Sequence, residues 1–535
     1  MKKRFSAVTV VTVFALALLV GTQVNNLVSG DNIYEQLNKF KDVLSMTEKV
    51  YVDNVDTPKL VEAAINGMLG SLDPHSIYLP PAQLVTVNQD FQGAFEGIGI
   101  EFDIVDDTIL VIQTISGGPS EALGMHAGDR IVKINDTSAV GIARDQVPKK
   151  LKGPKGTHVK VTIFRPGEKD LFAFDIIRDK IPIFSVDASF IAKDDIGYIA
   201  VNKFAEHTNE EFNAAVAKLK GQGMKRMVLD LRNNPGGYLD QAFLMASEFL
   251  PSGRKIVSTK GRIRDMNDSM LTRGDGPLVD VPLVVLVDHG SASASEIVTG
   301  AMQDWDRGLV VGETTFGKGL VQRQYNLQDS SAFRLTVGRY YTPSGRSIQR
   351  PWGKDFEEYH RAAFEKEDTE GDNLDHAHDA DSTKPVYKTA GGRKIYGGGG
   401  ITPDYVSISP KLTAYTAALL RKNLFLDLIT TYMEANAPQF KQQYGSDVTK
   451  FFNEYQVDDQ MVKKLTDSGV KNGVQIDKDQ YDKDQVYIKT YLKAYIARAL
   501  WGDEGWRKVM TGIDTQFQKA VTLFPEAEKI AGLHY

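Results

Sequence analysis

One segment, Leu283-Val-Val-Leu-Val-Asp-His-Gly-Ser-Ala-Ser-Ala-Ser-Glu296, joins a strand pattern to a helix pattern through a serine-rich turn. Leu283–Val287 is uniformly apolar, as in a short buried strand, and Ser293–Asp304 has helical spacing. This order places a serine hydroxyl at a helix N-terminus, where unpaired N–H groups and the positive dipole end face it. The segment therefore predicts that a nucleophile and an oxyanion site share one loop.

Three serines in this loop compete for the nucleophile's role: Ser291, Ser293 and Ser295. One of them is equally expected as a simple helix cap, so spacing alone does not choose between them. A serine also needs a base, and His289 lies four residues before Ser293. Because the chain turns at Gly290, little directs the imidazole back to the hydroxyl. A structural role for His289 is favoured, although a Ser-His-Asp arrangement remains open.

Lys318 is the other candidate base. It is the lone charge between Thr314-Thr-Phe-Gly317 and Gly319-Leu-Val321. Its ordinary pKa of ~10.4 means that it must be desolvated to become neutral. Gln322 lies four residues further on and would share a face with the lysine if the segment were helical. The structural alternative is a lysine that extends from a glycine loop into solvent.

Strand and helix patterns alternate from about Ile181 to Ile348. This alternation predicts βαβ units and a largely parallel sheet. In such sheets the chemistry gathers in loops beyond the carboxyl ends of the strands. Two loops lie there: Asn233-Asn-Pro-Gly-Gly237, after Met227–Leu231, and the serine-rich turn.

A separate β-rich region extends from about Phe91 to Arg178, with strand patterns at Thr108–Ile112 and His158–Ile163. Within it, Gly97-Ile-Gly-Ile100 places two glycines just before a strand. Successive N–H groups can then converge on a carboxylate without obstruction by Cβ atoms. A simple β-turn is the alternative interpretation.

The remaining regions flank this centre. Residues from about Asp31 to Leu79 have helical spacing, and the chain beyond Pro410 is strongly helical but carries no motif with nameable chemistry. The acidic stretch Glu365–Asp381 is expected to be solvated and flexible rather than a metal site. Lys2-Lys3-Arg4 precedes the apolar run Phe5–Val20, the order of an export signal.

Composition excludes several classes of function. The 535 residues include no cysteine, so thiol nucleophiles, thiolate metal sites and disulfides are ruled out. The net charge of -6 provides no basic face and argues against nucleic acid as the main partner. The length predicts several domains, because one hydrophobic core does not grow to this size.

Five motifs follow one another along the chain in the order found in a known protein family. They are Asp73-Pro-His-Ser-Ile-Tyr78, Asp230-Leu-Arg-Asn-Asn-Pro-Gly-Gly237, Gly290-Ser-Ala-Ser-Ala-Ser-Glu296, Gly312-Glu-Thr-Thr-Phe-Gly-Lys-Gly319 with Val321-Gln322, and Tyr341-Thr-Pro-Ser-Gly-Arg-Ser-Ile-Gln349. Together they resemble the carboxyl-terminal processing (tail-specific) protease family. The resemblance spans about residues 35 to 350. At most, the C-terminal region is similar to the helical extensions that some members carry.

The resemblance implies roles for individual residues. Ser293 corresponds to the nucleophile, Lys318 to the general base and Gln322 to the residue that orients it. The oxyanion hole would be the Ala294 N–H with an N–H of Gly236-Gly237, of which Gly237 is favoured. Glu296 and Asp304 are interpreted as structural supports of the helix. This mechanism requires no cofactor and no metal.

The resemblance also implies a PDZ domain that would take protein or peptide substrates by apolar or unfolded C-termini. Its carboxylate loop would consist of Gly97, Ile98, Gly99 and Ile100. Val147 and Leu151 would line the pocket for the last side chain of the bound peptide.

The resulting expectation is an α/β multidomain chain. Its regions are a signal peptide or inner-membrane anchor (1–30, with the anchor at 5–20), a helical N-terminal region (31–90), a PDZ domain (91–180), a protease core with a mixed sheet (181–351), an acidic and glycine-rich linker (352–410) and a helical C-terminal domain (411–535). The predicted protein is an exported, periplasmic serine endopeptidase, and the N-terminal helices would form a homodimer.

Two rival functions stay open. One is a non-catalytic PDZ scaffold that holds partner tails; the presence of Ser293, Lys318 and Gln322 together argues against it. The other is an acyl-group enzyme on a similar core. No glycine loop followed by a basic residue, as a coenzyme's phosphates would require, is apparent in the sequence.

Overall fold

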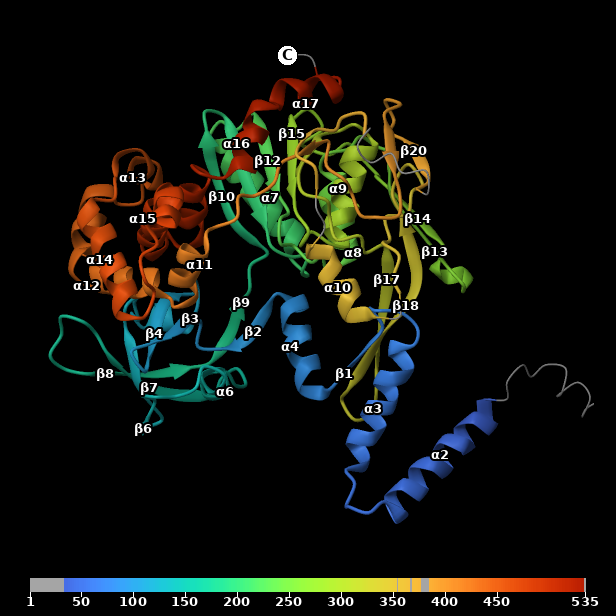
Figure 1. Cartoon of the computed structure of the whole chain (residues 1–535), viewed down its shortest axis with the longest axis horizontal. Coiled ribbons are helices and arrows are strands. Elements are labelled where there is room, and N and C mark those ends of the chain that lie inside the picture. Colours follow the sequence, from blue (N-terminus) through green and yellow to red (C-terminus); the bar gives the residue numbers. More distant parts are fainter. Residues whose placement is uncertain (1–32, 354, 366–367, 377–383, 534–535) are drawn as a thin grey trace, which may run out of the picture. The chain divides into compact units, whose positions relative to one another are not determined.

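The computed structural model describes residues 33–353, 355–365, 368–376 and 384–533 (Figure 1). The chain divides into two compact units, residues 1–78 and 79–535. In the first unit, α2 (Ile33–Val50) and α3 (Thr57–Gly70) are helical, as the apolar spacing predicts. Asp56 caps α3 by accepting a hydrogen bond from the Lys59 N–H at 3.3 Å.

Membrane anchoring concerns residues 1–30, which lie outside the described part of the chain. Among the described residues, no helix is both long and apolar enough to span a membrane. The export-signal interpretation therefore stays a prediction.

In the second unit, α4 (Pro81–Gln92) leads into the β-rich domain. Its sheet has the order β3-β4-β5-β7-β8, with β6 beside β5, and a ribbon of β2 and β9 closes the domain. The elements are β2 (Ala94–Gly97), β3 (Ile100–Val105), β4 (Thr108–Thr114), α5 (Pro119–Ala122), β5 (Arg130–Ile134), β6 (Thr137–Ser138), α6 (Gln146–Leu151), β7 (His158–Phe164), β8 (Phe172–Ile177) and β9 (Asp179–Pro182). Strand β3 lies at an edge of this sheet.

The region of alternating strands and helices is built on a seven-stranded sheet of order β10-β11-β12-β15-β16-β22-β19, called the central sheet below. The five central strands are parallel, and the edge strands β10 and β19 are antiparallel to their neighbours. The mixed sheet is confirmed. Its strands are β10 (Val186–Lys193), β11 (Ile196–Val201), β12 (Arg226–Asp230), β15 (Leu283–Val287), β16 (Leu309–Gly312), β19 (Gly371–Asp372) and β22 (Tyr405–Val406).

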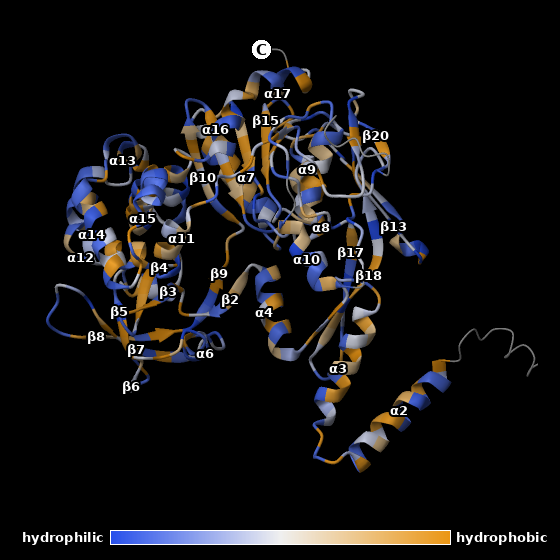
Figure 2. Ribbon diagram, viewed as in Figure 1, coloured by the Kyte–Doolittle hydropathy of each residue, from blue (hydrophilic) through white to orange (hydrophobic). Residues whose placement is uncertain are grey.

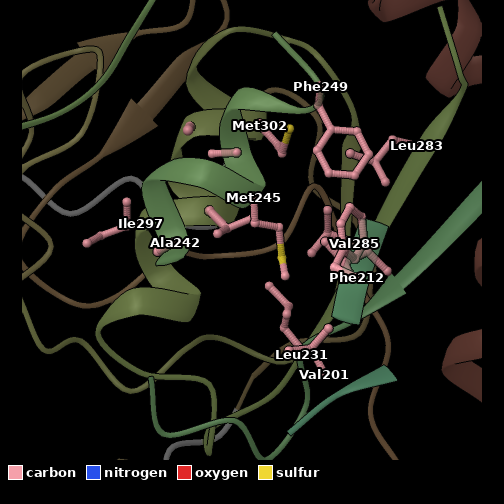
Figure 3. Close-up of a cluster of buried hydrophobic side chains, with 14 of the residues drawn as sticks. Val201, Phe212, Leu231, Ala242, Met245, Phe249, Leu283, Val285, Ile297 and Met302 are labelled. Carbon is pink, nitrogen blue, oxygen red and sulfur yellow. The ribbon is translucent and has the colours of Figure 1, made fainter. Parts of the chain in front are cut away.

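Helices cover both faces of this sheet, which is why its central strand β15 is apolar throughout (Figure 2). Leu283, Val285 and Val287 of β15 face the cluster formed with α7 (Thr208–Gly221), α8 (Leu239–Ser247) and α9 (Ala294–Asp304), shown in Figure 3. Val284 and Leu286 face the opposite cluster, formed with α16 (Thr515–Thr522) and α17 (Phe524–Ile530).

A second, antiparallel sheet stands beside the first. Strand β18 pairs with both β13 and β17, and β13 pairs with β14. The remaining elements here are β1 (Ile77–Leu79), β13 (Lys255–Gly261), η1 (Arg264–Met266), β14 (Asp268–Leu271), β17 (Leu320–Asn326), β18 (Ala332–Tyr341) and α10 (Phe356–Phe364). Strand β17 begins two residues after Lys318 and therefore carries the chain away from that lysine.

The acidic and glycine-rich segment differs from its expectation. Strands β19 and β22 belong to the central sheet, and Asn373 and His376 are buried at 1% exposure. The nearby ribbon of β20 (Val386–Lys388) and β21 (Lys394–Tyr396) is also ordered. The expectation that Glu365–Asp381 is solvated is wrong for Asn373 and His376, because composition does not reveal that the segment returns to the sheet. Gly371 and Asp372 of β19 are exposed.

The C-terminal region forms its own helical core around α12 and α15. Its helices are α11 (Ala414–Arg421), α12 (Leu424–Tyr444), α13 (Val448–Glu454), α14 (Asp459–Lys471) and α15 (Lys478–Met510), the last kinked at Trp501 and Gly502. Helices α16 and α17 then leave this bundle and pack on the central sheet.

Candidate active site

The serine-rich turn lies between β15 and α9, and its three serines have different environments. Ser291 Oγ donates to the Leu231 carbonyl at 2.8 Å, and Ser295 Oγ donates to the Asn234 carbonyl at 2.9 Å; both serines are fully buried. Ser293 instead lines a cleft. These contacts distinguish the serines where spacing does not, and they leave Ser293 as the candidate nucleophile.

Ser293 also has an uncommon backbone. It is the N-cap of α9, and its backbone angles are φ 57° and ψ -111°. Residues other than glycine rarely adopt this region of φ/ψ space. Backbone strain of this kind concentrates at functional sites, where the surrounding structure must hold it in place. The turn thus stores strain at the residue that faces the cleft.

A single buried carboxylate supports this strained turn. Glu296 Oε2 accepts hydrogen bonds from the Ser293 N–H at 2.8 Å and from the Lys318 N–H at 2.9 Å. Its Oε1 accepts from Thr315 Oγ1 at 2.6 Å and from the Gly317 N–H at 2.8 Å. Burial raises the pKa of Glu296, although all four donors favour the charged form. Glu296 therefore joins the start of the helix to the lysine loop, which is more than the helix support expected from sequence.

Lys318 Nζ donates a hydrogen bond to Gln322 Oε1 at 2.9 Å. The expected contact is present, but its expected geometry is wrong. Gln322 lies on β17 rather than on a helix, and a register irregularity between Val321 and Gln322 interrupts the regular alternation of the strand. A spacing of four residues places two side chains on one face of a helix. Here the same spacing brings Lys318 and Gln322 together on a strand with an irregular register.

Tyr340 on β18 contacts the backbones of both candidate catalytic residues. Its hydroxyl lies 3.0 Å from the Ser293 carbonyl oxygen and also contacts the Lys318 carbonyl oxygen. The side chain is 1% exposed, and burial raises the pKa of its phenol well above the usual value. A neutral, fixed hydroxyl therefore holds both backbones in place.

The Asn233–Gly237 loop supplies the other wall. Asn234 anchors it, because its side chain donates to the Val201 carbonyl at 2.8 Å and accepts from the Gly236 N–H at 2.9 Å. The Gly236 N–H is thus engaged. Within the described residues, the Gly237 N–H and the Ala294 N–H have no hydrogen-bond acceptor among the contacts of this loop and helix start.

Glycine is required at both loop positions. A Cβ atom on Gly236 would lie 2.8 Å from the Ala294 nitrogen and from the Ser293 Cβ, and one on Gly237 would lie 2.0 Å from the Phe204 carbonyl oxygen. Their φ values of 96° and 151° also favour glycine. The close approach of Gly236 brings the loop against the nucleophile's own backbone.

All of these groups meet in one cleft of about 910 Å³. The predicted residues that line it are Ser293, Ala294, Lys318, Gln322, Gly236 and Gly237. Among the described residues, no group of three or more histidine, aspartate or glutamate side chains is arranged to hold a metal ion. The arrangement provides a hydroxyl, an amine held by an amide oxygen, and two N–H donors.

His289 points elsewhere. Its Nδ1 lies 2.7 Å from the Thr314 carbonyl oxygen, and its Nε2 lies 3.6 Å from Glu313 Oε2. It is not among the residues that line the cleft. The histidine thus packs the turn against the segment that precedes the lysine.

The predicted peptide-binding residues lie in the β-rich domain and are not part of the cleft. Val147 on α6 is fully buried, Leu151 is 4% exposed, and both belong to the domain's core cluster together with Ile98. Gly99 has φ 77°, and a Cβ there would lie 3.3 Å from Gly118 Cα. The loop is closely packed on its inner side, and Ile100 begins the edge strand β3.

Comparisons with known proteins identify the chain at the family level. The model of peptidase family S41 matches residues 195–355, and that of PDZ domains matches residues 85–164. The activating protease CtpB N-terminal domain matches residues 20–81, and a family of unknown function, DUF8443, matches residues 415–502. A carboxy-terminal-processing protease of Bartonella bacilliformis is 40% identical over 341 residues, which are 62% of this chain and 77% of that protein. The chain belongs to the carboxy-terminal-processing protease family.

Other members of the family match a similar portion of the chain. A probable CtpA-like serine protease of Staphylococcus aureus is 39% identical over 334 residues, 61% of this chain and 65% of that protein. The solved structure of a photosystem II D1 C-terminal processing protease is 29% identical and covers 61% of this chain and 96% of that one, with a TM-score of 0.33. At the level of class, the chain is a serine-type protease with a PDZ domain.

Sequence reasoning missed an ionic network behind the Asn233–Gly237 loop. Arg232 Nη2 lies 2.6 Å from Asp230 Oδ2 and 2.6 Å from Asp514 Oδ2, and its Nη1 donates to Gln516 Oε1 at 2.8 Å. Burial opposes the charge on Arg232, but the two carboxylates raise its pKa well above the usual value. Asp514 and Gln516 begin α16, so they lie 282 or more positions away in the sequence, and no local pattern signals the contact.

Proposed function

We propose that this protein hydrolyses peptide bonds with Ser293 as the nucleophile, Lys318 as the general base and Gln322 as the residue that orients the lysine. The observation that carries this proposal is the convergence of these residues on one cleft, with Lys318 Nζ held 2.9 Å from Gln322 Oε1. The common attachment of the Ser293 and Lys318 backbones to Glu296 supports a fixed pair.

The chemistry follows from these positions. Ser293 Oγ forms a bond to the substrate carbonyl carbon while neutral Lys318 takes the hydroxyl proton. The Gly237 and Ala294 N–H groups would stabilise the oxyanion, a contribution typically worth ~3 kcal/mol for each donor. Collapse breaks the C–N bond, the leaving amine takes the proton from Lys318, and water then hydrolyses the ester with the lysine acting again as base.

The PDZ domain is proposed to capture the substrate's tail. An extended C-terminus would add as a strand beside β3, whose outer edge has no partner strand among the described elements. Its carboxylate would meet the N–H groups of Gly97, Ile98, Gly99 and Ile100. The buried Val147 and Leu151 make the wall behind that loop apolar, which suits an apolar last residue.

Export is proposed from the N-terminal sequence. Lys2-Lys3-Arg4 followed by an apolar run over residues 5–20 has the order of a signal segment. The protein would act outside the cytoplasm, in the periplasm if the cell has one. A membrane-fractionation experiment on the full chain distinguishes a cleaved signal from a retained anchor.

The catalytic assignment is tested with an unfolded protein substrate. Ser293→Ala and Lys318→Ala are each expected to lower the cleavage rate by about 10³-fold or more, because triad-type residues act as a unit. The exposed Ser252→Ala and Lys225→Ala are matched controls that should cleave at the wild-type rate. Undiminished cleavage by either cleft variant would overturn the assignment.

A further inference from the structure

The cleft that contains Ser293 also contains an arginine that the proposed reaction does not use. Arg334 lies on β18 directly opposite Gln324 of β17, and the next position of that face, Thr336, lies opposite Gln322. Diagonal neighbours on one face of an antiparallel pair have Cα atoms about 7–8 Å apart. Arg334 is therefore one step along the sheet from the residue that holds the lysine.

The guanidinium of Arg334 is fixed in orientation. It lies 4.7 Å from the ring centroid of Phe91, which itself meets Tyr238 edge-on at 5.0 Å. Stacking of this kind covers one face of the planar guanidinium and leaves its N–H edges available. All three residues line the cleft.

The N–H groups of Arg334 make only long hydrogen-bond contacts. Within the described residues, Arg334 makes no ion pair, and its Nε and Nη2 have only long contacts of 3.4 Å to the same oxygen, Gln324 Oε1. Half-burial lowers the pKa of Arg334, and no carboxylate offsets that cost, although an arginine remains charged at neutral pH. By contrast, Arg232 and Arg346 of the same core are each paired with an aspartate.

The charge of the cleft favours an anion. Its lining carries four cationic side chains, Lys203, Lys318, Arg323 and Arg334, and two carboxylates, Asp90 and Asp240, for a sum of 4 - 2 = +2. With Lys318 neutral the sum is +1. The whole chain has a net charge of -6, so the cleft differs in sign from the molecule around it.

We propose that Arg334 binds a carboxylate of the peptide lying in the cleft, through the paired N–H···O geometry that guanidinium and carboxylate groups share. The carboxylate is either the free C-terminus of the substrate or an aspartate or glutamate side chain close to the cut. This inference rests on the proposed function, and it makes the cleft, in addition to the PDZ domain, a determinant of which chains are cut.

The test uses matched quenched fluorescent peptides with the full-length enzyme. One pair differs by glutamate or glutamine near the cut and is amidated at its C-terminus, so that it offers no terminal carboxylate to the PDZ domain. The other pair has identical sequence and ends in a free acid or an amide. Wild type should prefer the carboxylate in at least one pair. Because the PDZ domain would also favour a free acid, the source of that preference is the pair in which Arg334→Gln removes it.

Arg334→Gln should lower kcat/KM for the preferred carboxylate peptide by about 10-fold or more, since hydrogen bonds to charged groups are the strong ones, and should leave its uncharged partner within about twofold. Arg334→Lys keeps the charge without the fork and should recover part of the preference. Arg273→Gln, at an exposed arginine outside the cleft lining, is the control and should leave kcat/KM for both peptides unchanged. Equal loss on both members of a pair, or no preference in wild type, would refute the carboxylate site while leaving the protease intact.

A binding measurement separates this inference from the catalytic one. Peptide affinity is measured for Ser293→Ala with and without Arg334→Gln, and the change caused by the arginine substitution is compared between acid and amide. Binding to the PDZ domain contributes equally to both proteins and cancels. A carboxylate-specific loss supports the site even if the enzyme cuts none of the peptides, and an identical loss for both peptides contradicts it.

Discussion

At the residue scale, the candidate site depends on two buried side chains that hold the backbones of Ser293 and Lys318. Glu296 is fully buried and accepts four hydrogen bonds, two of them from the backbones of Ser293 and Lys318. Tyr340 reaches the carbonyl oxygens of the same two residues. The spacing of Ser293 and Lys318 is therefore fixed by contacts of their backbones rather than by their side chains.

Glu296→Gln tests this positioning. An amide would present N–H groups to donors that now meet a carboxylate, so we expect a loss of about 1–3 kcal/mol in stability and a lower melting temperature. Cleavage should fall by about 10–100-fold in kcat with little change in KM, because misplacement rather than binding is affected. The exposed Glu210→Gln provides the control. A kcat that stays at the wild-type value would show that Glu296 does not align the pair.

Sequence predicted part of this site and could not predict the rest. The serine-rich turn and the isolated lysine were visible because both depend on local pattern. The choice of Ser293 over Ser291 and Ser295 came from family resemblance, and the structure adds a physical reason in the buried partners of the other two. The sequence predicts Glu296 only as a structural support of the helix, since its contacts with the lysine loop are 19 to 22 positions away.

At the element scale, alternation along the sequence predicted the sheet and the helices on one face, but not what covers the other face. Phe517 of α16 and Phe524 of α17 belong to the same buried cluster as Val228 and Leu286. The apolar character of these two strand residues indicates only that they are buried. A buried strand does not reveal which later segment buries it. The same reason explains why β22 was mistaken for part of a linker.

The start of α16 also reaches Arg232, just before the Asn233–Gly237 loop, through Asp514. This residue caps its own helix by accepting the Phe517 N–H at 3.0 Å and pairs with Arg232, which immediately precedes the Asn233–Gly237 loop. The C-terminal extension is therefore expected to keep the loop that carries the Gly237 N–H in position.

Asp514→Asn preserves a capping side chain and removes the charge that faces Arg232. Because the arginine keeps Asp230, we expect a moderate loss of about 1–3 kcal/mol in stability together with a several-fold lower kcat. Asp477→Asn changes the cap of α15 without an ion pair in the described structure and serves as the control. Thermal unfolding and steady-state cleavage measure the two effects. A stability loss with unchanged kcat would limit the extension to a structural role.

At the scale of the whole molecule, helix α2 has an exposed apolar face. None of its residues is buried, and Ile33, Leu37, Phe40, Val43 and Met46 recur at helical spacing with exposures of 44–65%. A stripe of this length is costly in water and marks an interaction surface. The homodimer predicted from the sequence would cover the same stripe on both partners, and this prediction can be tested at α2.

Leu37→Glu with Phe40→Glu is expected to abolish this association, because two carboxylates would be desolvated in the middle of the stripe. Light scattering over a range of concentrations should give about twice the chain mass for the wild type and once the chain mass for the variant. As a control, Val486→Glu introduces a charge at an exposed valine of α15. This variant should have the same mass in solution as the wild type. A wild-type protein that stays monomeric at every concentration would contradict the dimer, and an equal effect of Val486→Glu would move the interface away from α2. Since the cleft residues all lie in the second unit, the monomeric variant should retain cleavage of a short peptide, which separates assembly from chemistry.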